Sequence, residues 1–128
     1  MGVFGGRNGK DEGKAPGRGP DFSDVDAGRA EALAGEGVLA PLYMMPLRFG
    51  GEESVRNRLL VPPVAVALKD RFDDMVEELL IQEKVNGYEC RPEYQGTSFV
   101  PTAITIIAKQ KGEPVFTQRI QIWGGKDQ

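Results

Sequence analysis

The side chains that most often carry catalysis are nearly missing from this sequence, since its 128 residues include no histidine and one cysteine, Cys90. Histidine titrates closest to neutral pH and most often serves as general base or metal ligand. Its absence excludes dyads and triads that use histidine, and one cysteine cannot complete a zinc site of the Cys/His kind. We expect Cys90 to be a buried, unreactive thiol, because Arg91 lies on the opposite face of the predicted strand.

Three glycine-rich or acidic segments resemble known binding loops, but each lacks residues that its pattern requires. Residues 4–11 end like a phosphate-binding loop, but Phe4 replaces the first glycine and Asp11 the Ser or Thr that should follow the lysine. Residues 24–28 begin like a calcium loop, yet the glycine comes one position early. Residues 35–40 match a dinucleotide pattern in letters, but no strand precedes them and a proline follows. We therefore expect no cofactor and no metal ion.

Six aromatic, sulfur-containing or cationic side chains could instead line a pocket or an interface. Our leading hypothesis is a non-catalytic binding or protein-interaction module that can self-associate through a sheet edge or face, with Trp123 exposed at the end of the last strand. The alternative is a small-ligand-binding protein or enzyme with a pocket between helix and sheet and a carboxylate or Arg48 at its rim. A second alternative is an architectural part of a larger assembly. The candidate residues are Tyr43, Met45, Arg48, Tyr88, Tyr94 and Trp123.

Charge and composition restrict the partners and the compartment. The formal charge is −3 and the isoelectric point is near 5.0, so the chain has no overall field that attracts phosphate backbones, and nucleic acid is a disfavoured partner. A single cysteine allows no intrachain disulfide and favours a reducing compartment. Neither a membrane-spanning apolar run nor a secretory signal pattern is present. We expect a cytoplasmic protein whose partner is another protein or a second copy of the chain.

The N-terminal part of the chain has little to bury. Residues 1–20 are rich in glycine and predict a disordered tail, and we expect residues 125–128 to be disordered as well. Residues 21–38 form a predicted linker that can contain a short helix, capped by Ser23 or Asp24 and closed by Gly35. Such a helix would be frayed, docked on the domain, or ordered by a partner.

Residues 39–124 predict a single α+β domain. Alternation predicts an edge strand over Pro41–Phe49 that can break at Pro46, and residues 52–61 are a loop or a short strand. A helix starts at Pro63 and runs to about Lys84, with an apolar stripe on one side. Its other side carries acidic residues, which we expect to be solvated: Asp70, Asp73, Asp74, Glu77 and Glu78.

Three strands complete the predicted domain. They cover residues 88–95, 99–109 and 115–123, and the middle one has apolar residues on both faces, which is typical of a central strand. The fold class is therefore one α-helix packed on a four-stranded, mainly antiparallel sheet in the order β-α-β-β-β. This order resembles the cystatin-like arrangement in topology alone, which implies no activity.

Overall fold

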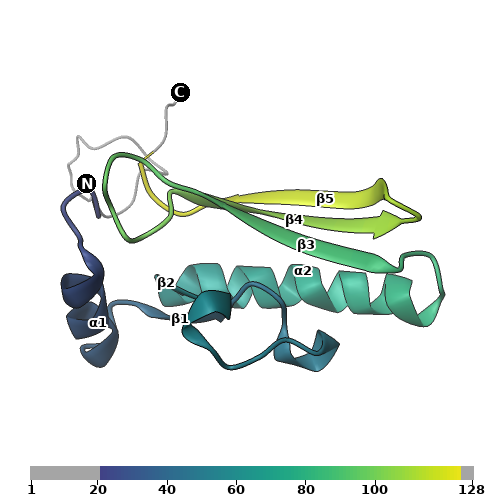
Figure 1. The fold of residues 1–128 in the computed structure, drawn as a ribbon, viewed down its shortest axis with the longest axis horizontal. Helices are drawn as coiled ribbons and strands as arrows, with labels where there is room; N and C mark the ends of the chain where they lie inside the picture. The colour runs from purple at the N-terminus through teal and green to yellow at the C-terminus, as the bar shows by residue number, and fades with distance from the viewer. Residues whose placement is uncertain (1–20, 125–128) are drawn as a thin grey trace, which may run out of the picture.

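The computed structural model describes residues 21–124, so the predictions for residues 1–20 and 125–128 lie outside the described part of the chain. This part is α+β, with five strands in two antiparallel sheets. In Figure 1, α2 runs along one face of the sheet β3–β4–β5, and α1 lies at one end of the molecule beside the start of β1. The elements are, in chain order, α1 (Ala27–Gly35), β1 (Ala40–Tyr43), the 3-10 turns η1 (Leu47–Phe49) and η2 (Val55–Asn57), β2 (Arg58–Val61), α2 (Pro63–Ile81), β3 (Gly87–Glu93), β4 (Ala103–Gln110) and β5 (Glu113–Gln121).

The prediction of one four-stranded sheet is wrong, because the first strand does not join the C-terminal strands. β1 pairs antiparallel with β2, with Leu42 opposite Leu59, and the two form a separate sheet. The undecided segment 52–61 thus ends in a strand. Both sheets still contribute to one core cluster, in which Leu42, Leu59 and Val61 lie with Ile104 and other residues of β4.

The first strand is also shorter than predicted. Beyond Tyr43, the Met44 backbone N–H still donates to the Asn57 carbonyl at 2.8 Å. At Met45 the Asn57 side chain takes over: it accepts a hydrogen bond from the Met45 backbone N–H at 2.8 Å and donates one to the Met45 carbonyl at 2.9 Å. Pro46 follows and has no N–H to donate. The chain then turns into η1, so the strand predicted to reach Phe49 ends at Tyr43.

The three C-terminal strands form the predicted antiparallel meander. The sheet order is β3–β4–β5, and the central position of β4 is confirmed. Cys90 lies opposite Ile106, and Ile104 lies opposite Ile120, so these residues share the face that packs into the core. The strand predicted to begin at residue 99 begins at Ala103, because the preceding residues form a turn.

Helix α2 covers the inner face of this sheet. It begins with Pro63 at its first turn, as predicted, and ends at Ile81 rather than near Lys84, since Glu83 adopts a left-handed φ of 61°. Val76 is fully buried, and Phe72 contacts Phe116 of β5 with ring centroids 6.4 Å apart. In the described residues no helix is both long and apolar enough to cross a membrane.

A second core cluster forms around α1. The helix is capped by Asp26, rather than by Ser23 or Asp24, and buries Leu33 against Phe22, Leu39 and Trp123. The Ser98 hydroxyl donates to the Phe22 carbonyl at 2.6 Å. The segment predicted to be a linker is therefore docked on the rest of the described chain.

The expectation that Trp123 is exposed is wrong. Its side chain is 2% exposed and its indole N–H donates to the Val100 carbonyl at 2.9 Å. The ring also meets Phe22 edge to face, with centroids 6.4 Å apart. Phe22, which precedes α1, packs against this ring. The alternation of residues within the last strand gives no information on that contact.

Candidate ligand-binding pocket

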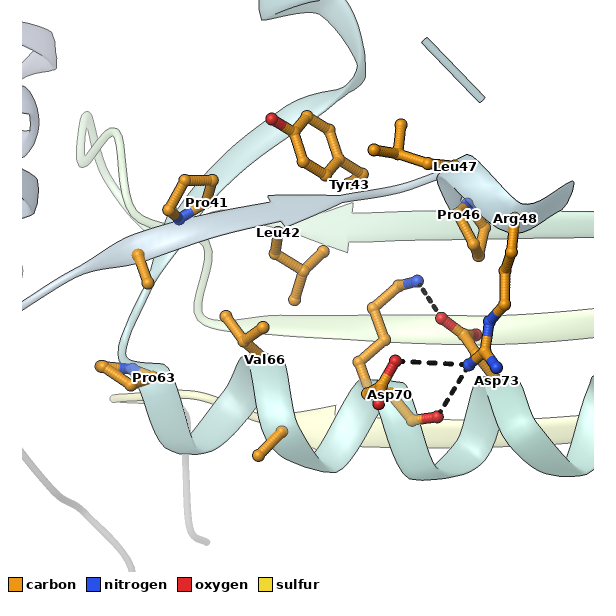
Figure 2. A pocket seen from close by; sticks show the side chains of 13 residues that line it. Pro41, Leu42, Tyr43, Pro46, Leu47, Arg48, Pro63, Val66, Asp70 and Asp73 are labelled. Atoms are coloured by element: carbon orange, nitrogen blue, oxygen red, sulfur yellow. Dashed lines mark hydrogen bonds and ion pairs between the residues drawn. The ribbon is translucent and has the colours of Figure 1, made fainter. Parts of the chain in front are cut away.

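A pocket of about 510 Å³ lies between the β1–η1 segment and the first half of α2. Its size is within the range of small-molecule sites, about 300–1,000 Å³. Figure 2 shows that Leu42 and Val66 point toward one another across it, and that Arg48 reaches down toward Asp70 on the helix. The lining residues are Ala40, Pro41, Leu42, Tyr43, Pro46, Leu47, Arg48, Pro63, Val66, Ala67, Lys69, Asp70 and Asp73.

The walls of the pocket are mostly apolar and locally stiff. Three prolines, Pro41, Pro46 and Pro63, lie at three of its borders, and each has a fixed φ and no backbone N–H. Leu42 and Val66 supply aliphatic surface from the strand and the helix. Such walls favour an apolar ligand and offer it few competing hydrogen-bond donors from the backbone.

Two oppositely charged side chains on the pocket lining are almost completely buried. Lys69 and Asp73 are one helical turn apart, and their ammonium and carboxylate lie 2.6 Å from each other. Their side chains are only 4% and 5% exposed. This finding corrects the prediction that Asp73 belongs to the solvated side of the helix: a buried carboxylate needs partners, and Lys69 is one of them.

Tyr88 of β3 is the other partner of Asp73. Its hydroxyl donates to Asp73 Oδ1 at 2.6 Å, while Lys69 donates to Oδ2, so each carboxylate oxygen accepts one strong hydrogen bond. The Lys69 ammonium also lies 5.5 Å from the centroid of the Tyr88 ring. The three side chains thus form a polar cluster, Lys69–Asp73–Tyr88, that joins α2 to the sheet.

Burial and the negative charge of Asp73 change the acid–base properties of the neighbouring groups. Burial is the main cause of a strongly raised pKa for Tyr88, and the hydrogen bond to Asp73 adds to it. Burial also raises the pKa of the Cys90 thiol to about 11, opposed by Lys69 and assisted by Asp73. Both groups therefore stay protonated at neutral pH, so neither supplies an anionic nucleophile or base there.

Arg48 connects the outer wall of the pocket to α2. Its guanidinium donates to Asp74 at 2.6 Å, to Glu77 at 3.0 Å and to the Asp70 carbonyl at 3.0 Å. The Asp70 carboxylate adds a contact at 3.3 Å, and dashed lines in Figure 2 mark the two bonds to Asp70. The hydrogen bond to Asp74 is the main cause of a raised pKa for Arg48. This ion network holds η1 over the helix.

The loop that carries Arg48 is also closed on itself. Besides bonding Met45, the Asn57 amide donates to the Glu52 carbonyl at 2.9 Å. Gly51 packs so closely that an added Cβ would lie 2.0 Å from the Met45 carbonyl oxygen. Only glycine fits there without a backbone shift, so the loop has a well-defined position at the pocket.

The structure brings together some of the six candidate residues predicted from sequence. Tyr43 and Arg48 line the pocket, and Tyr88 lies behind it in the polar cluster. Met45 lies in the adjoining loop without lining the pocket, and Tyr94 is 51% exposed beyond the end of β3. Trp123 belongs to the other core cluster.

Sequence reasoning missed Lys69 and Asp73. A signal for them was present: opposite charges four residues apart, flanked by Ala65 and Val76 at the spacing of one helix face. Acidic residues precede and follow Asp73 in the sequence, and together they indicated one continuous solvated face. They are Asp70, Asp74 and Glu77.

Comparison with known proteins adds no assignment, because no family model matches the chain and neither a curated protein nor a solved structure matches it. Within residues 21–124, no group of three or more cysteine, aspartate or glutamate side chains is placed to hold a metal ion.

Proposed function

We propose that the protein binds a small, mainly apolar molecule in the pocket between the β1–η1 segment and α2. The observation that carries this proposal is the combination of about 510 Å³ of apolar-walled space with the buried Lys69–Asp73 pair on its lining. Buried charge is costly unless it is compensated, and polar groups that converge on an apolar pocket are typical of ligand sites.

Binding is favoured over catalysis by the state of the polar cluster. Asp73 already accepts one hydrogen bond on each oxygen, and burial keeps the Tyr88 hydroxyl protonated. A general base must come within hydrogen-bond distance of the proton that it removes, and the Asp73 side chain is only 5% exposed and lies between its two donors. The cluster is therefore better suited to orient a bound molecule than to remove a proton from it.

Binding of a ligand is also favoured over the protein-interaction role that the sequence suggested. That role relied in part on an exposed Trp123, which is buried. On the outer face of the larger sheet, charged side chains pair with one another, as Glu89 does with Lys109 and Glu93 with Arg119. Paired charges on a sheet face are typical of a surface that remains in water.

A fragment screen by two-dimensional amide NMR tests the proposal. Small aromatic and aliphatic fragments should shift amide signals of β1, η1 and the first half of α2. The variant Ala67→Phe should abolish these shifts, because Ala67 is exposed and lines the pocket. Val64→Phe is the matched control, since Val64 is 75% exposed on the same helix and is not part of the lining.

A further inference from the structure

We propose that the molecule bound in this pocket is uncharged and carries an oxygen acceptor, such as a ketone, ester or amide carbonyl, that receives a hydrogen bond from Lys69. This inference rests on the proposed function and names the chemical class of the ligand. The unused donors of Lys69 and the charges around the pocket both favour such a ligand.

The Lys69 ammonium has more donors than the described protein groups use. An ammonium carries three N–H donors. One is directed to Asp73 Oδ2 at 2.6 Å, and the ring of Tyr88 offers a π-face 5.5 Å away rather than a lone pair. Because the side chain is 4% exposed and lies on the pocket lining, an oxygen acceptor on a bound molecule is well placed to take a further N–H.

The surrounding charge disfavours an anionic ligand. Asp73 already balances Lys69, and three carboxylates surround Arg48. Both cations of the pocket lining are therefore already paired, and Asp74 and Glu77, which lie outside the lining, add negative charge beside Arg48. A carboxylate or phosphate would find no uncompensated cation there. The carboxylates around Arg48 are Asp70, Asp74 and Glu77.

A cationic ligand meets a different obstacle. Its ammonium would lie beside Lys69, where two like charges repel each other. Asp73 would compensate two cations only in part, since it carries one negative charge and already pairs with Lys69 at 2.6 Å. An uncharged acceptor satisfies Lys69 without adding charge of either sign.

Four probes with one aromatic ring and different head groups test this inference on the full chain. Acetophenone carries a carbonyl, ethylbenzene lacks it, benzoate is an anion and benzylamine is a cation. Dissociation constants come from amide NMR titrations at one salt concentration. We expect acetophenone to bind several-fold to about tenfold more tightly than ethylbenzene, although ethylbenzene is more apolar, and more tightly than both charged probes.

The variant K69M/D73N assigns the effect to the ammonium. It removes the donor, while the amide introduced by Asp73→Asn keeps an acceptor for Tyr88 and no unpaired buried charge remains. Acetophenone should then bind no more tightly than ethylbenzene, whose affinity should not change. K84M removes an exposed lysine and is the control, and K69R, which keeps a donor, should retain part of the preference.

The outcomes separate this inference from the proposed function. The inference is overturned if acetophenone and ethylbenzene bind with equal affinity, or if benzoate or benzylamine binds more tightly than acetophenone. It is also overturned if K69M/D73N keeps the preference for acetophenone. In each case the pocket still binds a ligand, but one of another chemical class. Failure of all four probes to bind overturns the proposed function and the inference with it. If K69M/D73N does not fold, the ranking of the four probes on the unaltered chain decides alone.

Discussion

The Lys69 ammonium and the Asp73 carboxylate lie 2.6 Å apart with their side chains 4% and 5% exposed, which makes them an ion pair withdrawn almost entirely from water. Removing one partner of such a pair leaves a buried charge uncompensated and costs about 3–5 kcal/mol. Replacing both partners with apolar residues of similar volume often changes the free energy of unfolding little. The pair should therefore behave as a coupled unit in unfolding experiments.

We predict that Lys69→Met and Asp73→Leu each lower the free energy of unfolding by about 3–5 kcal/mol, and that the double variant loses less than either single variant. Urea unfolding followed by far-UV circular dichroism measures all three. Glu78→Gln is the control on the same helix and should change stability by less than about 0.5 kcal/mol. Additive losses in the double variant would contradict the pairing.

Tyr88 should make the protein sensitive to alkali. Its folded-state pKa is raised above the ordinary value of 10.0, mainly by burial, so the unfolded chain loses this proton first as pH rises. The contribution of Tyr88 to stability is then complete below about pH 10 and is lost progressively above it.

The corresponding prediction compares Tyr88→Phe with the unaltered chain. Between about pH 9 and 12, the stability of the unaltered chain should fall more steeply than that of the variant, because the variant has no proton to lose at this position. Urea unfolding at a series of pH values measures both slopes. Tyr94, whose pKa burial also raises, remains in both proteins and cancels in the comparison. If the stabilities of the two proteins fall in parallel as pH rises, the pKa of Tyr88 is the same in the folded and unfolded chain.

Arg48 should contribute a salt-dependent part of the stability. Its three carboxylate partners are 46–72% exposed, so ions in solution screen these contacts. Arg48→Met should lower the free energy of unfolding by about 1 kcal/mol at low salt, and the difference should shrink in about 1 M NaCl. Arg71→Met, an exposed arginine of the same helix, is the control. A loss that is independent of salt would indicate packing rather than charge.

Gly51 should be intolerant of any side chain. An added Cβ would lie 2.0 Å from a backbone oxygen, which cannot move without shifting the loop at the pocket wall. Gly51→Ala should cost about 1–3 kcal/mol of stability in thermal or urea unfolding. Gly35→Ala has open space around its Cβ and lies at the end of α1, so it should leave stability unchanged or raise it by up to about 1 kcal/mol. Equal effects of the two substitutions would contradict the close contact at Gly51.

The elements with strong local signals were predictable from sequence, and those defined by contacts between distant residues were not. The three C-terminal strands and the start of α2 at Pro63 follow from periodicity and from the position of proline. The pairing of β1 with β2 joins segments about twenty residues apart, and it ends where the Asn57 side chain bonds Met45 from twelve positions away. No alternation of apolar residues reveals such a bond.

The candidate site shows the same limit. Arg48 and Tyr43 were selected from their side-chain types and do line the pocket, whereas Asp73 was placed on the solvated side of the helix. Part of the compensation for its burial comes from Tyr88, a residue of another element fifteen positions away, whose hydroxyl donates to the carboxylate. A helix taken alone can show that Lys69 and Asp73 share a face, but the sheet decides that this face is buried.

Intermolecular nuclear Overhauser effects between acetophenone and the methyl groups of the isotope-labelled chain test the central claim most directly. The pocket predicts saturable contacts from the aromatic ring to the methyls of Leu42, Leu47 and Val66, which line it from both sides. Contacts confined to exposed apolar residues elsewhere, such as Met75 and Val115, or signals that do not saturate, would contradict a ligand site between the β1–η1 segment and α2.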